Sequence, residues 1–187
     1  MTKQPAANND RHGLGAMSGR GNHAQQAPAT DRDDTVQVDV SYGLARRGLP
    51  AATSFRRWVA AALAAAGHQG PASVAIRLVD QTEGRALNHD FRGRDYATNV
   101  LSFASGLPAG LPAGIAVPLG DIALCAPVIA AEASAQGKRL RDHYAHLSVH
   151  GVLHLLGHDH DDDASASAME ALEVTVLTGL GIADPYR

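Results

Sequence analysis

Histidines recur along one short stretch in the last third of the chain. His143, His146, His150 and His154 follow one another at steps of three or four residues. Such steps place all four side chains on one stripe of an α-helix, each about one turn from the next. Two imidazoles four residues apart can hold one metal ion from a single helical face. The spacing therefore predicts a metal site with His150 and His154 among its ligands.

A third ligand is expected just beyond the end of this helix. Gly157 is typical of a residue that ends a helix and turns the chain, so that His160 returns to the same ion. Three neutral imidazoles with one open position are typical of a catalytic zinc, whereas a structural zinc has four protein ligands. We therefore predict one Zn2+ per chain, held by His150, His154 and His160, with His158 as the alternative third ligand. Imidazoles also suit nickel, copper and iron.

The remaining polar residues of this region have other expected roles. His143 and His146, one or two turns before the ligands, are expected to orient them or to form a wall of the site. The acidic run from Asp161 to Asp163 is expected to be a solvated turn that caps the next helix, although with Asp159 it also offers carboxylates to a metal. Ordinary hydrogen-bonded histidines are the competing interpretation, but three at this spacing favour the metal.

The spacing H-x-x-x-H-x-x-G-x-x-H is also that of the metzincin proteases. In those enzymes a glutamate directly after the first histidine is the general base for the metal-bound water. Gly151 stands at that place in this chain. The sequence therefore predicts the metal scaffold of a peptidase without its proton-handling group.

The rest of the sequence predicts the elements that position these residues. Alternating apolar and polar residues, capping residues and helix-ending glycines mark their limits. Strands are expected at 35–42, 72–79, 98–105 and 118–125, and helices at 54–67, 80–91, 126–136, 140–156 and 165–177. Thr53 or Ser54 is expected to cap the first helix and Asp80 the second. The order predicts an α+β fold, a small mixed four-stranded sheet packed with about five helices, with the zinc site at the end of the long helix.

Composition limits the class of protein. The 187 residues, 45% of them hydrophobic, suffice for one domain, which we expect over 35–187. Residues 1–34 contain almost no large apolar side chains and are expected to be disordered. The net charge of -3 excludes a polycation that coats nucleic acid. The single cysteine, Cys125, excludes an intrachain disulfide, and neither a membrane span nor a signal peptide is visible, so we expect a cytoplasmic protein.

Several blocks of the chain resemble the YbeY-type endoribonucleases, bacterial rRNA maturation factors with a zinc ion held by three histidines. The resemblance covers roughly Val36 to Arg187, and its one visible departure is His158, where the family usually has tyrosine. The matching blocks are HGVLHLLGHDH from His150, FRGRDYATNVLSF from Phe91, LGDIALC from Leu119, EASAQGKRLRDHYAHLSVHG from Glu132, and the closing DPYR.

This resemblance implies a substrate, a partner and a further functional residue. The substrate is a phosphodiester of single-stranded RNA, especially the 3′ end of small-subunit rRNA, and the partner is the ribosome or its small subunit. Arg92 matches the family's arginine and is implied to be catalytic. Its planar, permanently charged guanidinium suits a phosphate and its developing negative charge. A metal can activate water or polarise the phosphoryl oxygen.

Because the net charge is negative, RNA binding requires a local basic surface. Candidate RNA-binding residues lie on both sides of the histidine stretch in the sequence: Arg92, Arg94, Lys138, Arg139 and Arg141. A second group of arginines, between 46 and 57, is more typical of a solvated face. Two other functions remain open at this point: a zinc hydrolase of another bond, such as a peptidase with a base from elsewhere, and a non-catalytic ribosome-assembly factor whose zinc stiffens the helix end.

Overall fold

The computed structural model describes residues 36–106, 115–159 and 162–187. All of them belong to one compact unit, Asp31–Arg187. Residues 1–34, for which the sequence predicts disorder, lie outside the described residues, and so does His160. In the described ranges, no helix combines the length and the apolar composition needed to cross a membrane.

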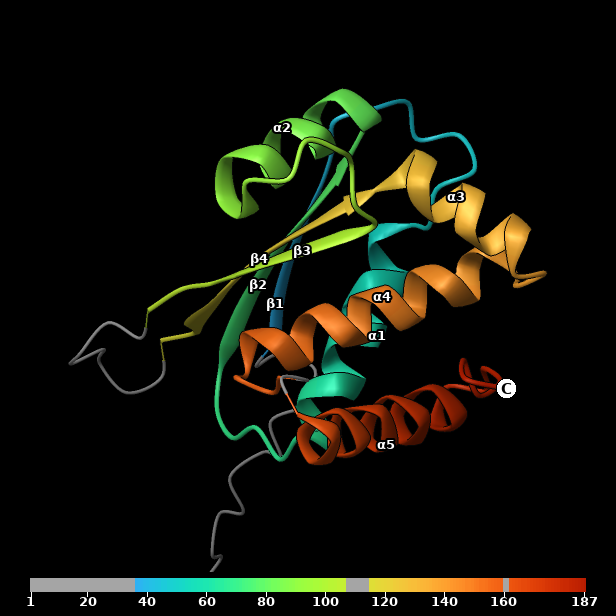
Figure 1. Ribbon diagram of the computed structural model, residues 1–187. Coiled ribbons are helices and arrows are strands. Elements are labelled where there is room, and N and C mark those ends of the chain that lie inside the picture. Colours follow the sequence, from blue (N-terminus) through green and yellow to red (C-terminus); the bar gives the residue numbers. More distant parts are fainter. Residues whose placement is uncertain (1–35, 107–114, 160–161) are drawn as a thin grey trace, which may run out of the picture. The chain divides into compact units, whose positions relative to one another are not determined.

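Four described segments form one mixed β-sheet (Figure 1). β2 lies between two parallel neighbours, β1 and β4, whereas β3 is an edge strand antiparallel to β4. The strand order is β1-β2-β4-β3. The bounds are β1 Val36–Tyr42, β2 Ala72–Val79, β3 Val100–Ala104 and β4 Val117–Cys125. The mixed four-stranded sheet predicted from the sequence is confirmed, and β2 has the predicted limits.

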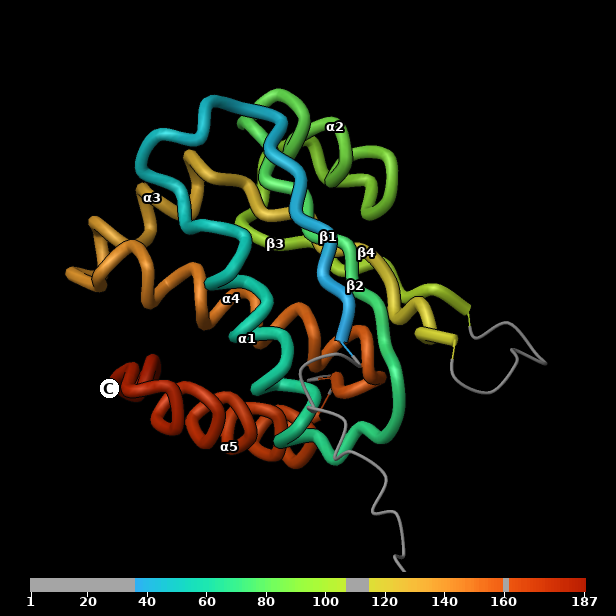
Figure 2. Tube along the Cα trace, turned by 180° about the vertical axis from the view of Figure 1, so that it is seen from behind, coloured from blue at the N-terminus to red at the C-terminus, as the bar shows by residue number. Residues whose placement is uncertain are grey.

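Five helices are described, and they confirm the predicted α+β class. Each lies within a few residues of its predicted place, and the predicted long helix is α4. The bounds are α1 Ala52–Ala65, α2 Gln81–Arg92, α3 Ala126–Ala135, α4 Leu140–Leu155 and α5 Asp163–Gly179. Figure 2, seen from behind, shows α5 beside α1 and α4, and both helices contact it.

The helices cover the two faces of the sheet in separate groups (Figure 1). A Cβ added at Gly151 of α4 would meet Ile122, whereas one added at Gly84 of α2 would meet Cys125. Ile122 and Cys125 are three residues apart on β4, so their side chains point to opposite faces. α4 and α2 therefore pack on opposite faces of the sheet. This separation decides which sequence-predicted residues lie near each other.

An aromatic cluster joins α1 to α4 on the first of these faces. Phe55 packs edge-on against Trp58 and Tyr144, with ring centroids 5.1 and 6.3 Å away. All three side chains are buried. Because edge-on aromatic pairs contribute beyond the area they bury, this cluster holds one side of α4 firmly. The histidine stripe lies on another side of the same helix and remains available for α5.

The beginning of α1 differs from the sequence prediction. Its N-cap is Ala51, without a side-chain hydrogen bond, and Thr53 and Ser54 lie inside the first turn. The hydroxyl of Tyr42 donates to the carbonyl of Pro50 at 2.8 Å, so the chain is fixed just before Ala51 and the helix starts there. The prediction that Thr53 or Ser54 caps this helix is wrong, because a tertiary contact replaces the local one.

Candidate metal centre

The two histidines predicted as ligands converge at the end of α4. The Nε2 atoms of His150 and His154 lie 3.1 Å apart, and the rings are nearly perpendicular. Two nitrogens held about 2.05 Å from one tetrahedral ion would lie about 3.3 Å apart. The separation thus fits two imidazoles that share an ion, and it is also short enough for a hydrogen bond between them when no ion is bound.

Gly157 ends the helix as the sequence predicts. It has a φ of 86°, a left-handed conformation that glycine adopts without steric cost. Its amide donates to the carbonyl of His154, and the next amide, of His158, donates to Leu153, both at 3.0 Å. This pair of bonds is the Schellman arrangement, which reverses the chain after a helix. His160, the predicted third ligand, lies outside the described residues.

A buried carboxylate orients His150, the first predicted ligand. Glu173, on α5, is only 1% exposed, and its two oxygens lie 2.7 Å from Nδ1 of His150 and 2.7 Å from Nε2 of His146. An ionised carboxylate only accepts hydrogen bonds, so both ring nitrogens must donate. With its proton on Nδ1, His150 presents an unprotonated Nε2 towards His154. This is the carboxylate–histidine pairing that prepares an imidazole to bind a metal.

The charge of Glu173 is secured by its three donors. Burial alone would raise the pKa of this carboxyl, but hydrogen bonds from His146, His150 and Tyr186 outweigh it and lower the pKa to about 2. Burial and the nearby carboxylate raise the pKa of Tyr186, so its hydroxyl stays protonated and donates to Glu173. A residue of the C-terminal DPYR block thereby contacts the carboxylate that orients His150.

His143 and His146 differ in their relation to the ligands. His146 shares Glu173 with His150, so it contacts the carboxylate that holds a predicted ligand. His143 is 4% exposed and bonds Glu132 of α3 at 2.8 Å. Glu132 also accepts from the side-chain amide of Asn99, at 3.0 and 3.1 Å. In the part of the chain that the structure describes, this second network ties α4 to α3 and to the residue before β3, not to the ligands.

Sequence reasoning missed Glu173. The residue lies on the buried stripe of α5, four residues after Met169 and three or four before Val176 and Leu177. A single acidic residue on such a stripe is a signal, because an ionised side chain is rarely buried unless it is paired. The signal does not name the partner. Asp162, from the acidic run, caps α5 by accepting from the amides of residues 164 and 165, as the sequence predicts.

Gly151, at the position of the missing protease base, faces the sheet. It is buried, and an added Cβ would lie 3.0 Å from Ile122 and 3.1 Å from the hydroxyl of Ser102. These contacts are tighter than ordinary packing, so the helix lies against the sheet as closely as a glycine permits. A side chain at this position would point towards the sheet and not towards the predicted metal ligands.

We therefore expect Gly151→Glu to unfold or strongly destabilise the protein rather than to produce a peptidase. A buried, unpaired carboxylate and the displaced β-sheet contacts should together lower the free energy of unfolding by several kcal/mol, about 3 or more. Denaturant titration of the variant measures this loss, and a casein assay measures any gained activity. A stable variant that cleaves casein would show that position 151 faces the metal ligands.

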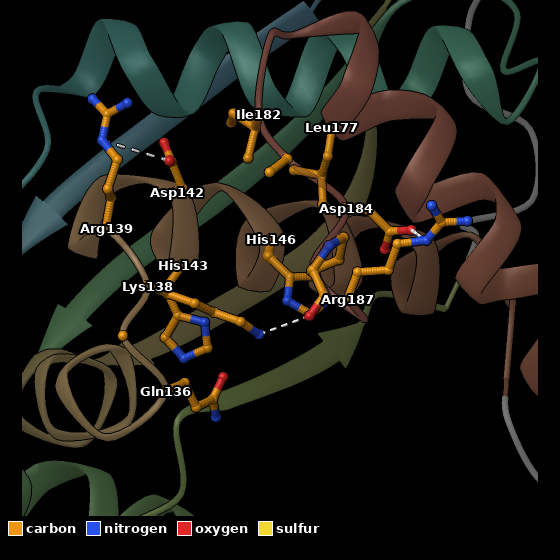
Figure 3. A pocket seen from close by; sticks show the side chains of 13 residues that line it. Gln136, Lys138, Arg139, Asp142, His143, His146, Leu177, Ile182, Asp184 and Arg187 are labelled. Carbon is orange, nitrogen blue, oxygen red and sulfur yellow. Dashed lines mark hydrogen bonds and ion pairs between the residues drawn. The ribbon is translucent and has the colours of Figure 1, made fainter.

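Two of the predicted RNA-binding residues share a pocket with the first histidines of α4 (Figure 3). The pocket has a volume of about 290 Å³, and Lys138, Arg139, His143 and His146 lie on its wall. The Lys138 ammonium donates to the carbonyl of Pro185 at 2.8 Å, drawn as a dashed line in Figure 3. This bond joins the turn before α4 to the C-terminal segment that carries Tyr186.

The other predicted basic residues lie elsewhere. The Arg141 guanidinium is placed over the ring of Trp58, 5.6 Å from its centroid. Arg92 is the last residue of α2, and Arg94 follows the left-handed turn at Gly93. Because α2 and α4 pack on opposite faces of the sheet, Arg92 and Arg94 are on the other face from the histidine stripe. The five predicted basic residues therefore do not form one continuous patch among the described residues.

The fold has a counterpart among solved structures. A protein of Thermotoga maritima solved in solution matches with a TM-score of 0.51 over 81% of this chain and 99% of its own, at 19% sequence identity. This likeness supports the fold class, an α+β protein with a four-stranded mixed sheet.

Sequence comparison identifies the family. A family profile described as endoribonuclease YbeY matches residues 48–181. Proteins named endoribonuclease YbeY from Xanthomonas oryzae and Alkalilimnicola ehrlichii are 62% and 59% identical over 81% and 86% of this chain, and each match covers 93% of the relative. The chain belongs to the YbeY endoribonuclease family. It is therefore a hydrolase, and the resemblance noted from the sequence is confirmed.

Proposed function

We propose that this chain cleaves single-stranded RNA with one Zn2+ held by His150, His154 and His160. The observation that carries the proposal is the 3.1 Å approach of the Nε2 atoms of His150 and His154, with Nδ1 of His150 bonded to the buried Glu173. Two prepared imidazoles at a helix end, followed by a chain reversal, suit a site with an open position. The names of the relatives supply the bond type, a phosphodiester of RNA.

The residues of the chain have distinct parts in this proposal. His150 and His154 bind the ion, Glu173 keeps the proton of His150 on Nδ1, and Tyr186 and His146 keep Glu173 ionised. The bound zinc would act as a Lewis acid and lower the pKa of a water for attack on phosphorus. His158 remains the alternative third ligand, and it follows Gly157 directly.

We also propose that Arg92 is a catalytic residue that contacts a phosphate of the bound RNA. Its exposed position at the end of α2 leaves the guanidinium accessible, and it makes no ion pair with another described residue. β3 is an edge strand of the sheet and has contacts on both faces. It packs against α4 on one face, and on the other its Phe103 contacts Phe91, the residue before Arg92. A single RNA strand that passes around this edge can reach both faces.

The cellular role proposed is maturation of rRNA, at the 3′ end of the small-subunit RNA, together with ribosome quality control. The partner is the ribosome or its small subunit, and the compartment is the cytoplasm, where the lone buried thiol of Cys125 would stay reduced. The YbeY family membership supports this role. Unprocessed 3′ ends of small-subunit rRNA in cells that lack the protein would be the expected phenotype.

Metal removal tests the proposed reaction. We expect the purified protein to contain one zinc per chain and to cut single-stranded RNA, and we expect a chelator to abolish cleavage and added zinc to restore it. Duplex RNA of the same sequence and casein are the control substrates. Cleavage of single-stranded RNA that persists after zinc is fully removed would contradict the proposal, and RNA binding without cleavage would favour an assembly factor. Casein cleavage would favour a peptidase whose general base lies elsewhere than at the buried position 151.

Arg92→Ala is expected to reduce RNA cleavage by about a hundredfold or more while zinc content and folding remain unchanged, because one preorganised charged donor is lost. Arg92→Lys should restore little, since an ammonium cannot reproduce the two-pronged contact with phosphate. Turnover is measured for wild type and both variants at two salt concentrations. The contrary result would be nearly normal turnover in Arg92→Lys, together with a loss of wild-type turnover at high salt that equals the loss in Arg92→Ala. It would make Arg92 part of a diffuse basic surface.

A further inference from the structure

A groove lies on the face of the sheet that carries α2, away from the histidine stripe. It has a volume of about 490 Å³. Its apolar wall includes Leu87 and Phe91 of α2 and Phe103 of β3, and Arg77 and Asp121 lie on its polar side. We call it the aromatic groove.

The aromatic groove has an exposed phenylalanine at its rim. Phe91 is 65% exposed, and its ring centroid lies 4.6 Å from that of Phe103, with the planes tilted by 58°. Five residues later, Tyr96 is 58% exposed. Single exposed apolar residues are common on protein surfaces and need no explanation. Phe91 differs from such residues because it lies on the wall of a groove next to a second aromatic ring, that of Phe103, which indicates a binding surface.

Two arginines lie between these aromatic residues in the sequence. Arg92 and Arg94 are both exposed, and within the described ranges neither makes an ion pair. Their guanidinium groups are thus available to an external anion. Exposed aromatic faces close to uncompensated cations are the combination that binds single-stranded nucleic acid, because bases stack on the rings and phosphates contact the charges. A protein segment would need the apolar wall but not the two unpaired arginines.

The segment that carries the four side chains is fixed in place. The buried side chain of Asn88 donates to the carbonyl of Tyr96 at 2.7 Å. Arg85 binds Asp95 through two contacts of 2.7 Å each. These bonds tie the loop between α2 and β3 back to α2. Because the loop is already ordered, little conformational entropy is lost when a ligand binds to it.

We propose that the aromatic groove is a nucleobase-binding site for single-stranded RNA, in which a base stacks on Phe91 and the adjoining phosphates contact Arg92 and Arg94. This inference rests on the proposed RNA-cleaving function and adds a subsite to it. The site selects single strands, because bases within a duplex are stacked on their neighbours and cannot reach the ring. The groove contains Phe91, the residue directly before the proposed catalytic Arg92, so it holds a nucleotide close to the phosphate that Arg92 contacts.

The test measures binding of a fluorescently labelled single-stranded RNA of about ten nucleotides, in chelator so that no cleavage occurs. We expect Phe91→Ala to weaken binding about tenfold or more, Phe91→Tyr to bind nearly as wild type, and Phe91→Leu to stay weak, because leucine keeps the apolar area but lacks a π face. Ile115→Ala, at another exposed apolar residue (51% exposed), is the matched control and should change nothing. Melting temperatures verify that each variant is folded.

Salt dependence separates stacking from charge. The defect of Phe91→Ala should persist at high salt, whereas the defect of Arg94→Ala should shrink, because phosphate contacts weaken with salt. Wild-type RNA binding by Phe91→Ala, or full rescue by leucine, would overturn the inference and point to a protein partner in the groove. Since binding is measured without metal, a failure of the zinc proposal would leave this result unchanged.

Discussion

Glu173→Gln is expected to weaken zinc binding by about ten- to a hundredfold although it leaves every histidine in place. The ionised carboxylate accepts from His150, His146 and Tyr186 at once. A glutamine has one accepting oxygen and one donating amide, so at least one of these three donors must lose its acceptor. If the amide faces His150, the imidazole must move its proton to Nε2, the atom that binds the metal. Loss of such an orienting partner typically costs this range of affinity.

Zinc affinity of this variant is measured by competition with a calibrated chelator, so the readout does not depend on activity. Glu132→Gln is the matched control: it alters another histidine–carboxylate pair on the same helix, that of His143, which has no described contact with a ligand. Tyr186→Phe removes one donor and keeps the carboxylate, so its effect should be smaller. Equal losses of affinity in the Glu132 and Glu173 variants would mean that general destabilisation, not orientation, explains the result.

The same variant has a defined dependence on pH. The pKa of Glu173 is lowered in the folded protein, from 4.5 to about 2. A carboxyl with a lowered pKa stabilises the fold fully above its unfolded pKa, and this contribution is lost as the pH falls towards the folded value. The difference in unfolding free energy between wild type and Glu173→Gln should therefore shrink as the pH falls below about 4.5. Denaturant titrations of the metal-free proteins at several pH values measure it.

The local features of the fold were predictable because residue type alone determines them. Gly157 ends α4 since few other residues adopt its left-handed conformation, and Asp80 caps α2 by accepting from the amide of Glu83. Apolar residues at every second position located β2. The start of α1 was misplaced because the contact from Tyr42 to Pro50 joins segments that no local pattern relates.

The candidate site was predictable to the same extent. The i, i+4 spacing places His150 and His154 together, because both are on one helix. Glu173 was missed because its histidine partners lie on a different helix, α4. The spacing of apolar residues within α5 carries no information about which residues of α4 it meets. The position of Arg92 relative to the histidines could not be predicted either. The sequence does not reveal that the sheet separates α2, which ends at Arg92, from α4. The structure also explains why no glutamate stands at position 151: α4 packs so closely on β4 there that only a glycine fits. The sequence alone does not show this packing.

His154→Ala is expected to abolish stoichiometric zinc and reduce RNA cleavage to background, with most of the stability retained. One of the two Nε2 atoms that approach each other at 3.1 Å is removed, and a site left with two imidazoles loses both affinity and geometry. The fold should survive, because His154 is only half-buried and the core lies on the other sides of α4. Zinc per chain, measured by elemental analysis after dialysis, and the melting temperature of the metal-free protein are the two readouts.

The same measurement decides the third ligand. His160→Ala should behave as His154→Ala does, because His160 is the proposed third ligand. His158→Ala should keep its zinc, because the turn after α4 is closed by the backbone amide of residue 158 and does not need its side chain. The reverse pattern would assign the third position to His158. His89→Ala, at an exposed histidine of α2 on the other face of the sheet, is the control for unspecific effects. Full zinc content in His154→Ala would refute the metal site itself, since no ion shared by His150 and His154 tolerates the loss of either.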